Sequence, residues 1–137
     1  MSKPLKGFIT YSHENTAQKD ELRKRLAVME QQNELKTWHD GDIIAGDKAR
    51  QENILKEVAT SDLLLFLVSA DSLASENCRE ELEEASKRDI TVISIILEHC
   101  DWLHHQLSGF EVLPHKGKPL TQWNDESEGW QNVVDGI

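Results

Sequence analysis

The residues best suited to chemistry lie together in the stretch 75–82, which reads SENCREEL. This stretch follows six consecutive apolar residues at 63–68, a run typical of a strand that is buried on both faces. Ser75 is a favourable helix N-cap, so we expect a helix to begin there. In open α/β sheets, ligands bind at the carboxyl ends of the strands. Glu81 is therefore expected on the first turns of a helix at the ligand-binding edge, where a carboxylate can do chemistry on a sugar.

Glu81 has several acidic neighbours, which leaves a second interpretation open. The acids could form a solvated helix face that the positive end of the helix dipole stabilises. Glu80 is expected to point about 100° away from Glu81 around the helix axis. It is therefore the natural internal control for any test of Glu81.

Ser12 and His13 end an earlier predicted strand, just before a predicted helix. Helix N-termini attract anions, so these two residues could hold a phosphate or a ribose. Simple turn chemistry explains them equally well. We expect His13 to act as a hydrogen-bond donor rather than as a general base.

Four residues have the composition of a metal site: His99, Cys100, His104 and His105. Zinc accepts such ligands. The sequence offers no second pair of ligands, however, so we expect no bound metal. The tryptophans that follow, Trp102, Trp123 and Trp130, are expected to be packing residues.

The elements that position these residues alternate between strand and helix along the whole chain. Strands are predicted at 7–11, 35–39, 63–68 and 90–97, with a brief extended piece near 112–113. Helices are predicted after Asn15 (burying Leu22, Leu26 and Met29), after Asp47 (burying Ile54, Leu55 and Val58), from Ser75, around 102–107 and from Glu126. Such alternation forms right-handed βαβ units and a parallel sheet covered on both faces. We therefore predict an α/β fold with three layers, formed by residues 1–137 as a single domain.

Composition and charge narrow the class of protein. The chain has 137 residues, of which 38% are hydrophobic and 29% charged, as expected of one ordinary globular domain. The formal net charge of −10 argues against binding to nucleic acid or to anionic lipid. No apolar run approaches the length of a membrane span, and the N-terminus lacks a signal-peptide core. The chain has only two cysteines, Cys78 and Cys100, so we expect a cytoplasmic protein. From the charge and the lack of a membrane span, we expect no nucleic-acid or membrane partner.

The whole chain resembles a bacterial Toll/interleukin-receptor (TIR) domain. Each matching motif is a weak signal by itself, but the ordered set at family spacing is a strong one. The motifs are 7–13 (GFITYSH), 38–40 (WHD), 43–47 (IIAGD), 67–69 (LVS) with Asp71, Ser75, Cys78, 81–82 (EL), 100–102 (CDW), 117–119 (GKP) with Trp123, and 133–137 (VVDGI).

The resemblance implies a flavodoxin-like fold with a five-stranded parallel sheet. Many bacterial and plant TIR domains cleave NAD⁺ at the nicotinamide–ribose bond, and their catalytic residue is the glutamate three positions after the helix cysteine. That residue is Glu81 in this chain. NAD⁺ would be a substrate rather than a cofactor. The resemblance also argues against a metal, because the motif at 100–102 occurs in metal-free members of the family.

The resemblance and the side-chain types together suggest a set of substrate-binding residues. These are Tyr11, Ser12, His13, Trp38, Asp40, Gly46, Ser69 and Cys78. Asn77 departs from the family pattern, because enzymatic relatives often carry an aromatic residue there that stacks on the base or the nicotinamide. Stacking would then have to come from Trp38, from Tyr11 or from a neighbouring subunit.

Residues 40–47 correspond to the BB loop of the family, which mediates head-to-tail assembly and closes the NAD⁺ pocket. Gly46 is expected to supply a positive φ angle, and the assembly residues are Asp42, Ile43, Ile44, Ala45 and Asp47. The resemblance implies activation by assembly with other TIR domains, a fused or separate sensor domain and a role in bacterial antiphage immunity. It leaves open whether the product is linear or cyclic ADP-ribose.

A non-catalytic adaptor that only binds other TIR domains is the alternative function. A phospho-receiver domain shares the fold, but it needs an acidic pair after the first strand, where this chain has Tyr11, Ser12 and His13. Neither G-x-G-x-x-G nor a phosphate-binding loop occurs in the sequence.

Overall fold

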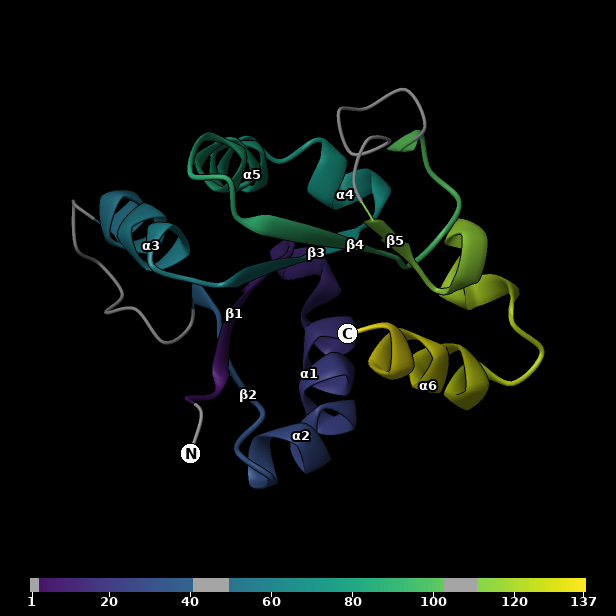
Figure 1. Cartoon of the computed structure of the whole chain (residues 1–137). Coiled ribbons are helices and arrows are strands. Elements are labelled where there is room, and N and C mark those ends of the chain that lie inside the picture. The colour runs from purple at the N-terminus through teal and green to yellow at the C-terminus, as the bar shows by residue number, and fades with distance from the viewer. Residues whose placement is uncertain (1–2, 41–49, 103–110) are drawn as a thin grey trace.

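The computed structural model of the chain describes residues 3–40, 50–102 and 111–137. Its centre is a parallel sheet of five strands in the order β2-β1-β3-β4-β5 (Figure 1). The strands are β1 (Leu5–Thr10), β2 (Leu35–Trp38), β3 (Leu63–Val68), β4 (Thr91–Ile96) and β5 (Glu111–Leu113). All four pairs of neighbouring strands are parallel. This confirms the predicted flavodoxin-like fold with a five-stranded parallel sheet.

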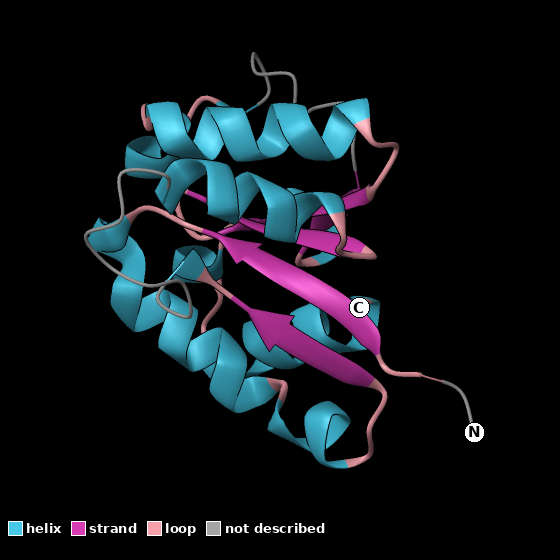
Figure 2. Ribbon diagram, turned by 90° about the vertical axis from the view of Figure 1, so that its left-hand side faces the viewer, coloured by secondary structure: helices cyan, strands magenta, loops and turns pink. Residues whose placement is uncertain are grey.

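Helices cover both faces of the sheet, which gives the predicted three layers (Figures 1 and 2). One face carries α1 (Thr16–Arg25), α2 (Ala27–Gln31) and α6 (Glu126–Gly136). The other face carries α3 (Arg50–Ala59), α4 (Ala70–Leu73) and α5 (Glu76–Lys87). In the described residues, short 3-10 turns also connect elements: η1 (His13–Asn15), η5 (His115–Gly117) and η6 (Leu120–Gln122).

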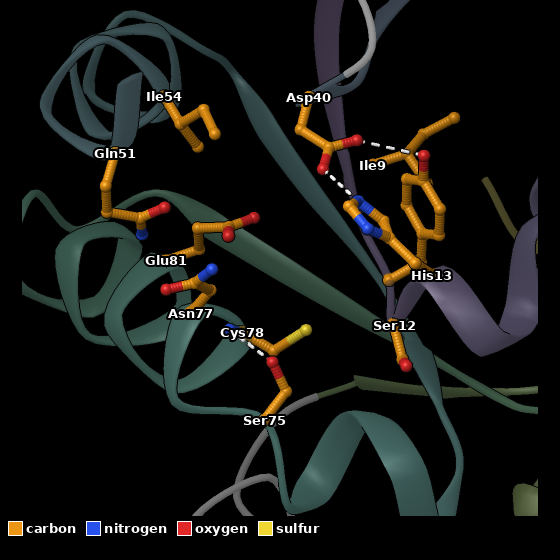
Figure 3. Close-up of a pocket in the computed structure, with 11 residues that line it drawn as sticks. Ile9, Ser12, His13, Asp40, Gln51, Ile54, Ser75, Asn77, Cys78 and Glu81 are labelled. Atoms are coloured by element: carbon orange, nitrogen blue, oxygen red, sulfur yellow. Dashed lines mark hydrogen bonds and ion pairs between the residues drawn. The ribbon is translucent and has the colours of Figure 1, made fainter. Parts of the chain in front are cut away.

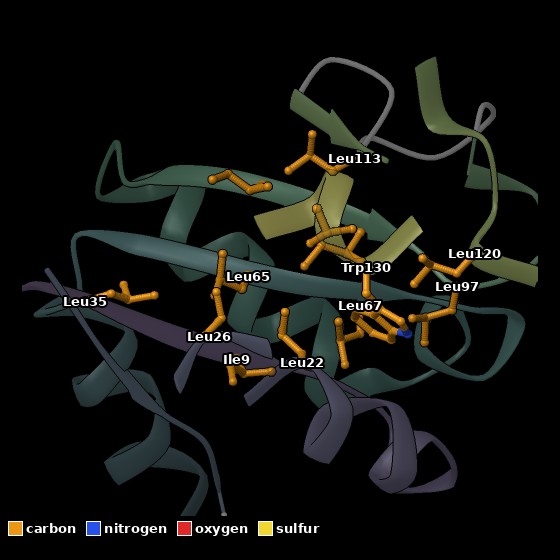
Figure 4. Close-up of a cluster of buried hydrophobic side chains, with 13 residues drawn as sticks. Ile9, Leu22, Leu26, Leu35, Leu65, Leu67, Leu97, Leu113, Leu120 and Trp130 are labelled. Carbon is orange, nitrogen blue, oxygen red and sulfur yellow. The ribbon is translucent and has the colours of Figure 1, made fainter. Parts of the chain in front are cut away.

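The core consists of two clusters of buried apolar side chains, one on each face of the sheet. In β3, Leu65 and Leu67 join the cluster beneath α1 and α6, which also contains Trp130 (Figure 4). Leu64 and Phe66 point the other way, into the cluster beneath α3 and α5. All four of these β3 side chains are at most 1% exposed, which confirms the prediction of a strand buried on both faces. Each such burial stabilises the fold by about 1.5–3 kcal/mol.

Three details of the fold differ from the sequence-based expectation. The helix expected after Asn15 breaks at Leu26, whose ψ of −1° is far from the helical value, so α2 starts afresh at Ala27. Leu55 and Met29 are half-buried rather than buried. The short helix α4 was not expected, and a reciprocal capping box between Ser69 and Ser72 forms its first turn.

Candidate active site

A cavity of about 120 Å³ lies at the carboxyl end of β1, on the face covered by α3 and α5 (Figure 3). In this strand order, β2 is added on one side of β1, and β3 and the later strands are added on the other. The topological switch point therefore lies between β1 and β3, where ligands bind in open α/β sheets. Four segments line the cavity: the end of β1 with its following turn, the chain just after β2, α3, and α5 with its cap. The lining residues are Ile9, Tyr11, Ser12, His13, Asp40, Gln51, Ile54, Ser75, Asn77, Cys78 and Glu81.

Glu81 reaches the cavity from the second turn of α5. As predicted, Ser75 caps this helix: its Oγ accepts a hydrogen bond of 3.2 Å from the backbone N–H of Cys78. Glu81 is only 6% exposed. Its Oε1 accepts a hydrogen bond of 3.1 Å from the hydroxyl of Thr10, the fully buried last residue of β1. The interpretation of Glu81 as part of a solvated acidic face is therefore wrong.

The Glu81 carboxyl group is in an environment that disfavours its charged form. Burial raises the pKa of Glu81 from 4.5 to about 8, and the negative charges of Asp40 and Glu80 add to this effect. The Thr10 hydroxyl opposes the shift. The amide of Gln51 also lowers this pKa, although no hydrogen bond of good geometry joins it to the carboxylate. Without a ligand, Glu81 is therefore mostly protonated at neutral pH.

A hydrogen-bonded network of three residues faces Glu81 across the cavity (Figure 3). Tyr11 Oη donates a hydrogen bond of 2.9 Å to Oδ1 of Asp40, and His13 Nε2 contacts Oδ2 of the same carboxylate. Since a carboxylate only accepts hydrogen bonds, Nε2 of His13 must carry a proton. The His13 side chain is 70% exposed, so it lies at the mouth of the site.

The environment of Cys78 excludes a role as a nucleophile at neutral pH. Its side chain lines the cavity but is only 2% exposed. Burial raises the pKa of the Cys78 thiol to about 12. Because the thiolate is the reactive form, this residue acts as an apolar part of the cavity wall.

Two residues expected in the binding site lie outside the cavity. Trp38 is in register with Phe8, two residues before the end of β1, and packs against the cluster beneath α3 and α5. The Nζ of Lys6 is 5.5 Å from its ring centroid. Ser69 is fully buried, and its hydroxyl donates a hydrogen bond of 2.6 Å to Oδ1 of Asn15. Its Oγ also accepts a hydrogen bond of 3.0 Å from the backbone N–H of Ser72, so Ser69 caps α4.

The expected BB-loop residues fall in a segment that the structure does not describe. Gly46, Asp42, Ile43, Ile44, Ala45 and Asp47 all belong to residues 41–49. Their assignments to substrate binding and to assembly therefore stay predictions. Asp40 is the last described residue before this segment, and it lies in the cavity wall as expected.

Thr10, Gln51 and Ile54 contribute to the site but were not among the expected site residues. Gln51 and Ile54 are one turn apart on α3, so the helical spacing that predicts a buried Ile54 also places Gln51 on the inner face. Thr10 lies two residues after Phe8 on the same face of β1. A second hollow of about 220 Å³ adjoins the cavity, and its lining residues, His13, Asp40, Gln51, Ile54 and Asn77, are shared with it. The site thus has an inner compartment at Glu81 and an outer one at the mouth.

Within residues 3–40, 50–102 and 111–137, no group of three or more histidine, cysteine or acidic side chains is arranged to hold a metal ion. His104 and His105 lie outside these ranges, so the expectation about the suspected metal cluster is not tested. Among the described helices, none is both long and apolar enough to cross a membrane. Trp130 is 3% exposed in one core cluster, and Trp102 packs against the other, as expected for packing residues.

The family model for the TIR domain matches residues 8–133. The uncharacterized protein y4lF of Sinorhizobium fredii is 37% identical over 135 residues, which are 95% of this chain and 42% of that protein. The chain thus spans less than half the length of this relative.

Solved structures with the same fold have low sequence identity to this chain. The TIR domain of the Toll-related receptor TRR-2 from Hydra magnipapillata matches with a TM-score of 0.61 and 18% identity, over 95% of each chain. The CMP N-glycosidase BcmB of Clostridium botulinum matches with a TM-score of 0.62 and 14% identity, over 96% of this chain and 99% of that one. A conserved protein of Enterococcus faecalis matches with a TM-score of 0.61 and 14% identity, over 98% and 99%. At these identities the likeness concerns the fold.

Proposed function

Because the chain belongs to the TIR domain family, we propose that it is an N-glycosidase that cleaves the nicotinamide–ribose bond of NAD⁺, with Glu81 as the catalytic residue. One observation carries this proposal. Glu81 is a buried carboxyl group that lines a cavity at the point where ligands bind in this fold. A buried acid of this kind has a cost in stability, which a catalytic role would explain.

The reaction needs little from the protein besides a well-placed negative charge. When the C1′–N bond breaks, its electron pair moves to the pyridinium nitrogen, and nicotinamide leaves as a neutral molecule. Positive charge then develops on the ribose, and the Glu81 carboxylate can stabilise it. Water adds to C1′ and loses a proton to give ADP-ribose, or a nitrogen of the adenine adds instead and gives a cyclic product. No general acid and no metal is required for this leaving group.

The charge of NAD⁺ also fits the protonation state of Glu81. The cationic pyridinium ring would favour the carboxylate form, because a nearby opposite charge lowers the pKa of an acid. Binding of NAD⁺ would therefore release the proton that burial holds on Glu81. Substrate binding would in this way generate the catalytic form of the residue.

Activation by assembly is part of this proposal. A second copy of the domain in a head-to-tail contact could complete the site, and such contacts extend into filaments unless they close into a ring. The sensor that would trigger assembly belongs to a fused segment or to a separate protein. A role in bacterial antiphage immunity is part of this proposal.

Two observations favour other functions. Asn77 is exposed and offers no ring for stacking, which favours a non-catalytic adaptor that binds other TIR domains. Conversely, the proton held by Glu81 would suit a glycosidase whose leaving base must be protonated, such as the pyrimidine of CMP, the substrate named for BcmB. The two enzymatic functions differ in the product that they release, and an adaptor releases none.

The test is incubation of the protein with NAD⁺ and, separately, with CMP, at low and at very high protein concentration, with chromatographic identification of products. We expect nicotinamide release that rises faster than linearly with protein concentration. Glu81→Gln should abolish release, whereas Glu80→Gln, which changes an acid outside the cavity lining, should not. Cytosine release from CMP alone would support a nucleotide N-glycosidase. A protein that assembles but cleaves neither compound would be an adaptor.

A further inference from the structure

Gln51 presents a buried hydrogen-bond donor, Nε2, that has no partner of good geometry within the protein. In the described part of the chain, three buried side-chain atoms have no hydrogen-bond partner: Gln18 Oε1, Gln51 Nε2 and Ser94 Oγ. Of these three residues, Gln51 lines the cavity of Glu81. Most buried polar groups in proteins are paired, so an orphan donor inside a cavity calls for an explanation. A ligand that accepts a hydrogen bond at this point would provide one.

The surroundings of Gln51 show where such a ligand atom would lie. The Gln51 amide extends from α3 and lies beside the Glu81 side chain in the wall of the inner compartment (Figure 3). One turn further along α3, Ile54 is 4% exposed and packs in the core. A packed helix, rather than a loop, therefore aims this amide. Gln51 lines both compartments, so it stands at the boundary between them.

The chemistry of the two facing groups points to a hydroxyl. A charged Glu81 can only accept hydrogen bonds, whereas Nε2 of Gln51 can only donate them. Thr10 occupies Oε1 of Glu81, which leaves Oε2 for a ligand. A hydroxyl is the small group that accepts from one neighbour and donates to another at the same time. A sugar with vicinal hydroxyls offers such groups beside its glycosidic carbon.

We propose that Gln51 Nε2 donates a hydrogen bond to a ribose hydroxyl whose own proton is donated to Glu81, which makes the inner compartment selective for ribosyl over deoxyribosyl substrates. This inference rests on the proposed N-glycosidase function, because it names the sugar that the same site recognises. Gln51 is thus a specificity residue. Sites built to bond a hydroxyl reject the analogue that lacks it, since their buried polar groups are then left unpaired.

A different role for Gln51 would give different results. If the amide only supported the Glu81 carboxylate, its removal would shift the pH dependence of turnover but leave the preference for ribose unchanged. If Gln51 were only a structural residue of α3, its removal would lower stability and leave both quantities unchanged. The preference for ribose is therefore the decisive measurement.

The experiment compares NAD⁺ with its 2′-deoxy and 3′-deoxy analogues on the nicotinamide ribose. It uses the wild-type protein, Gln51→Met, Gln51→Leu and the control Glu52→Gln, an exposed neighbour on the same helix. We expect the wild type to prefer NAD⁺ over one analogue by about 100-fold in kcat/KM. In both Gln51 variants this preference should fall to about tenfold. Because each ratio is compared between proteins, the intrinsic reactivity of the deoxy sugars cancels. Glu52→Gln should keep the wild-type ratio.

Binding of ADP-ribose, measured by calorimetry with the same proteins, separates this inference from the proposed function. NAD⁺ cleavage with an unchanged ribose preference in folded Gln51 variants would overturn the role of Gln51 and leave the function standing. Gln51-dependent binding of ADP-ribose without any cleavage would overturn the function and support Gln51 as a ribose contact. Neither binding at millimolar ADP-ribose nor cleavage would refute both.

Discussion

The hydroxyl of Thr10 donates a hydrogen bond of 3.1 Å to Oε1 of Glu81, which lies 71 positions later in the chain. Thr10 ends β1 and Glu81 lies on α5, so this bond joins the edge of the sheet to the candidate catalytic helix. Both side chains are buried, which makes the bond strong and the position of the carboxylate well defined. It also favours the charged form of Glu81 against the larger, opposing effect of burial.

The pH dependence of NAD⁺ cleavage should report the protonation state of Glu81. The free protein has a Glu81 pKa of about 8, and only the carboxylate can stabilise positive charge on the ribose. We therefore expect kcat/KM to rise about tenfold per pH unit below pH 8 and to level off above it. The kcat profile should have a lower apparent pKa, because bound NAD⁺ favours the carboxylate. A flat kcat/KM between pH 6 and 8 would contradict this assignment.

Thr10→Val removes the hydrogen bond to Glu81 and keeps the shape of the side chain. Since the Thr10 hydroxyl lowers the pKa of Glu81, its loss should move the acid limb of the kcat/KM profile to higher pH. We expect a loss of about tenfold in kcat/KM at pH 7 and of about 1–2 kcal/mol in the free energy of unfolding. Thr37→Val is the matched control.

The control removes an equivalent bond at a distance from the cavity. Thr37 is also buried on a strand, and its hydroxyl donates a hydrogen bond of 2.6 Å to Oε1 of Glu30. Thr37→Val should lower stability by a similar amount and leave the pH profile in place. If both variants shift the profile alike, Thr10 has no specific effect on Glu81.

Glu81→Gln should stabilise the fold at alkaline pH. The pKa of Glu81 rises from 4.5 to about 8 on folding, so the folded state binds more protons than the unfolded state between these values. Its contribution to stability is thus fully present below pH 4.5 and is lost as the pH rises through about 8. At pH 8.5 the variant should be more stable than the wild type by a few kcal/mol. Denaturant unfolding at pH 5 and pH 8.5 measures this difference, with Glu83→Gln, an exposed acid on the same helix, as the control. An equal change in stability between the two pH values in all three proteins would show that the pKa of Glu81 does not rise on folding.

Much of this arrangement could be predicted from the sequence because local signals carry it. Six apolar residues identify β3, and Ser75 marks the start of α5, so the position of Glu81 at the sheet edge follows from short segments. The position of Trp38 outside the described cavity could not be predicted, because its depth depends on the register between β2 and β1. Trp38 is paired with Phe8, two residues before the carboxyl end of β1, whereas Thr10 is at that end, next to the cavity. No local pattern states how far β2 extends beside β1.

Contacts between distant segments could not be predicted for a similar reason. Asp40 accepts a hydrogen bond from Tyr11, which lies 29 positions earlier in the chain. Gln51 lies near Glu81 only because α3 and α5 pack side by side. Side-chain type suggested that Tyr11 and Asp40 belong to the site but not that they bind each other. The unpaired Nε2 of Gln51 can be identified only when the positions of all neighbouring donors and acceptors are known.

Cys78 should be dispensable for cleavage although it lines the cavity beside Glu81. Its thiol is 2% exposed and has a pKa of about 12, so almost none of it is thiolate at neutral pH. In the native protein iodoacetamide should therefore modify Cys100, which is only partly buried, well before Cys78. Cys78→Ala should retain kcat within about threefold and lose about 1–2 kcal/mol of stability, because it removes one buried atom without removing a reacting group. Peptide mapping of the alkylated protein and turnover of the variant check the two parts. Rapid alkylation of native Cys78, together with loss of turnover in the Cys78→Ala variant, would indicate a thiol-dependent reaction. Glu81 would then have a supporting role.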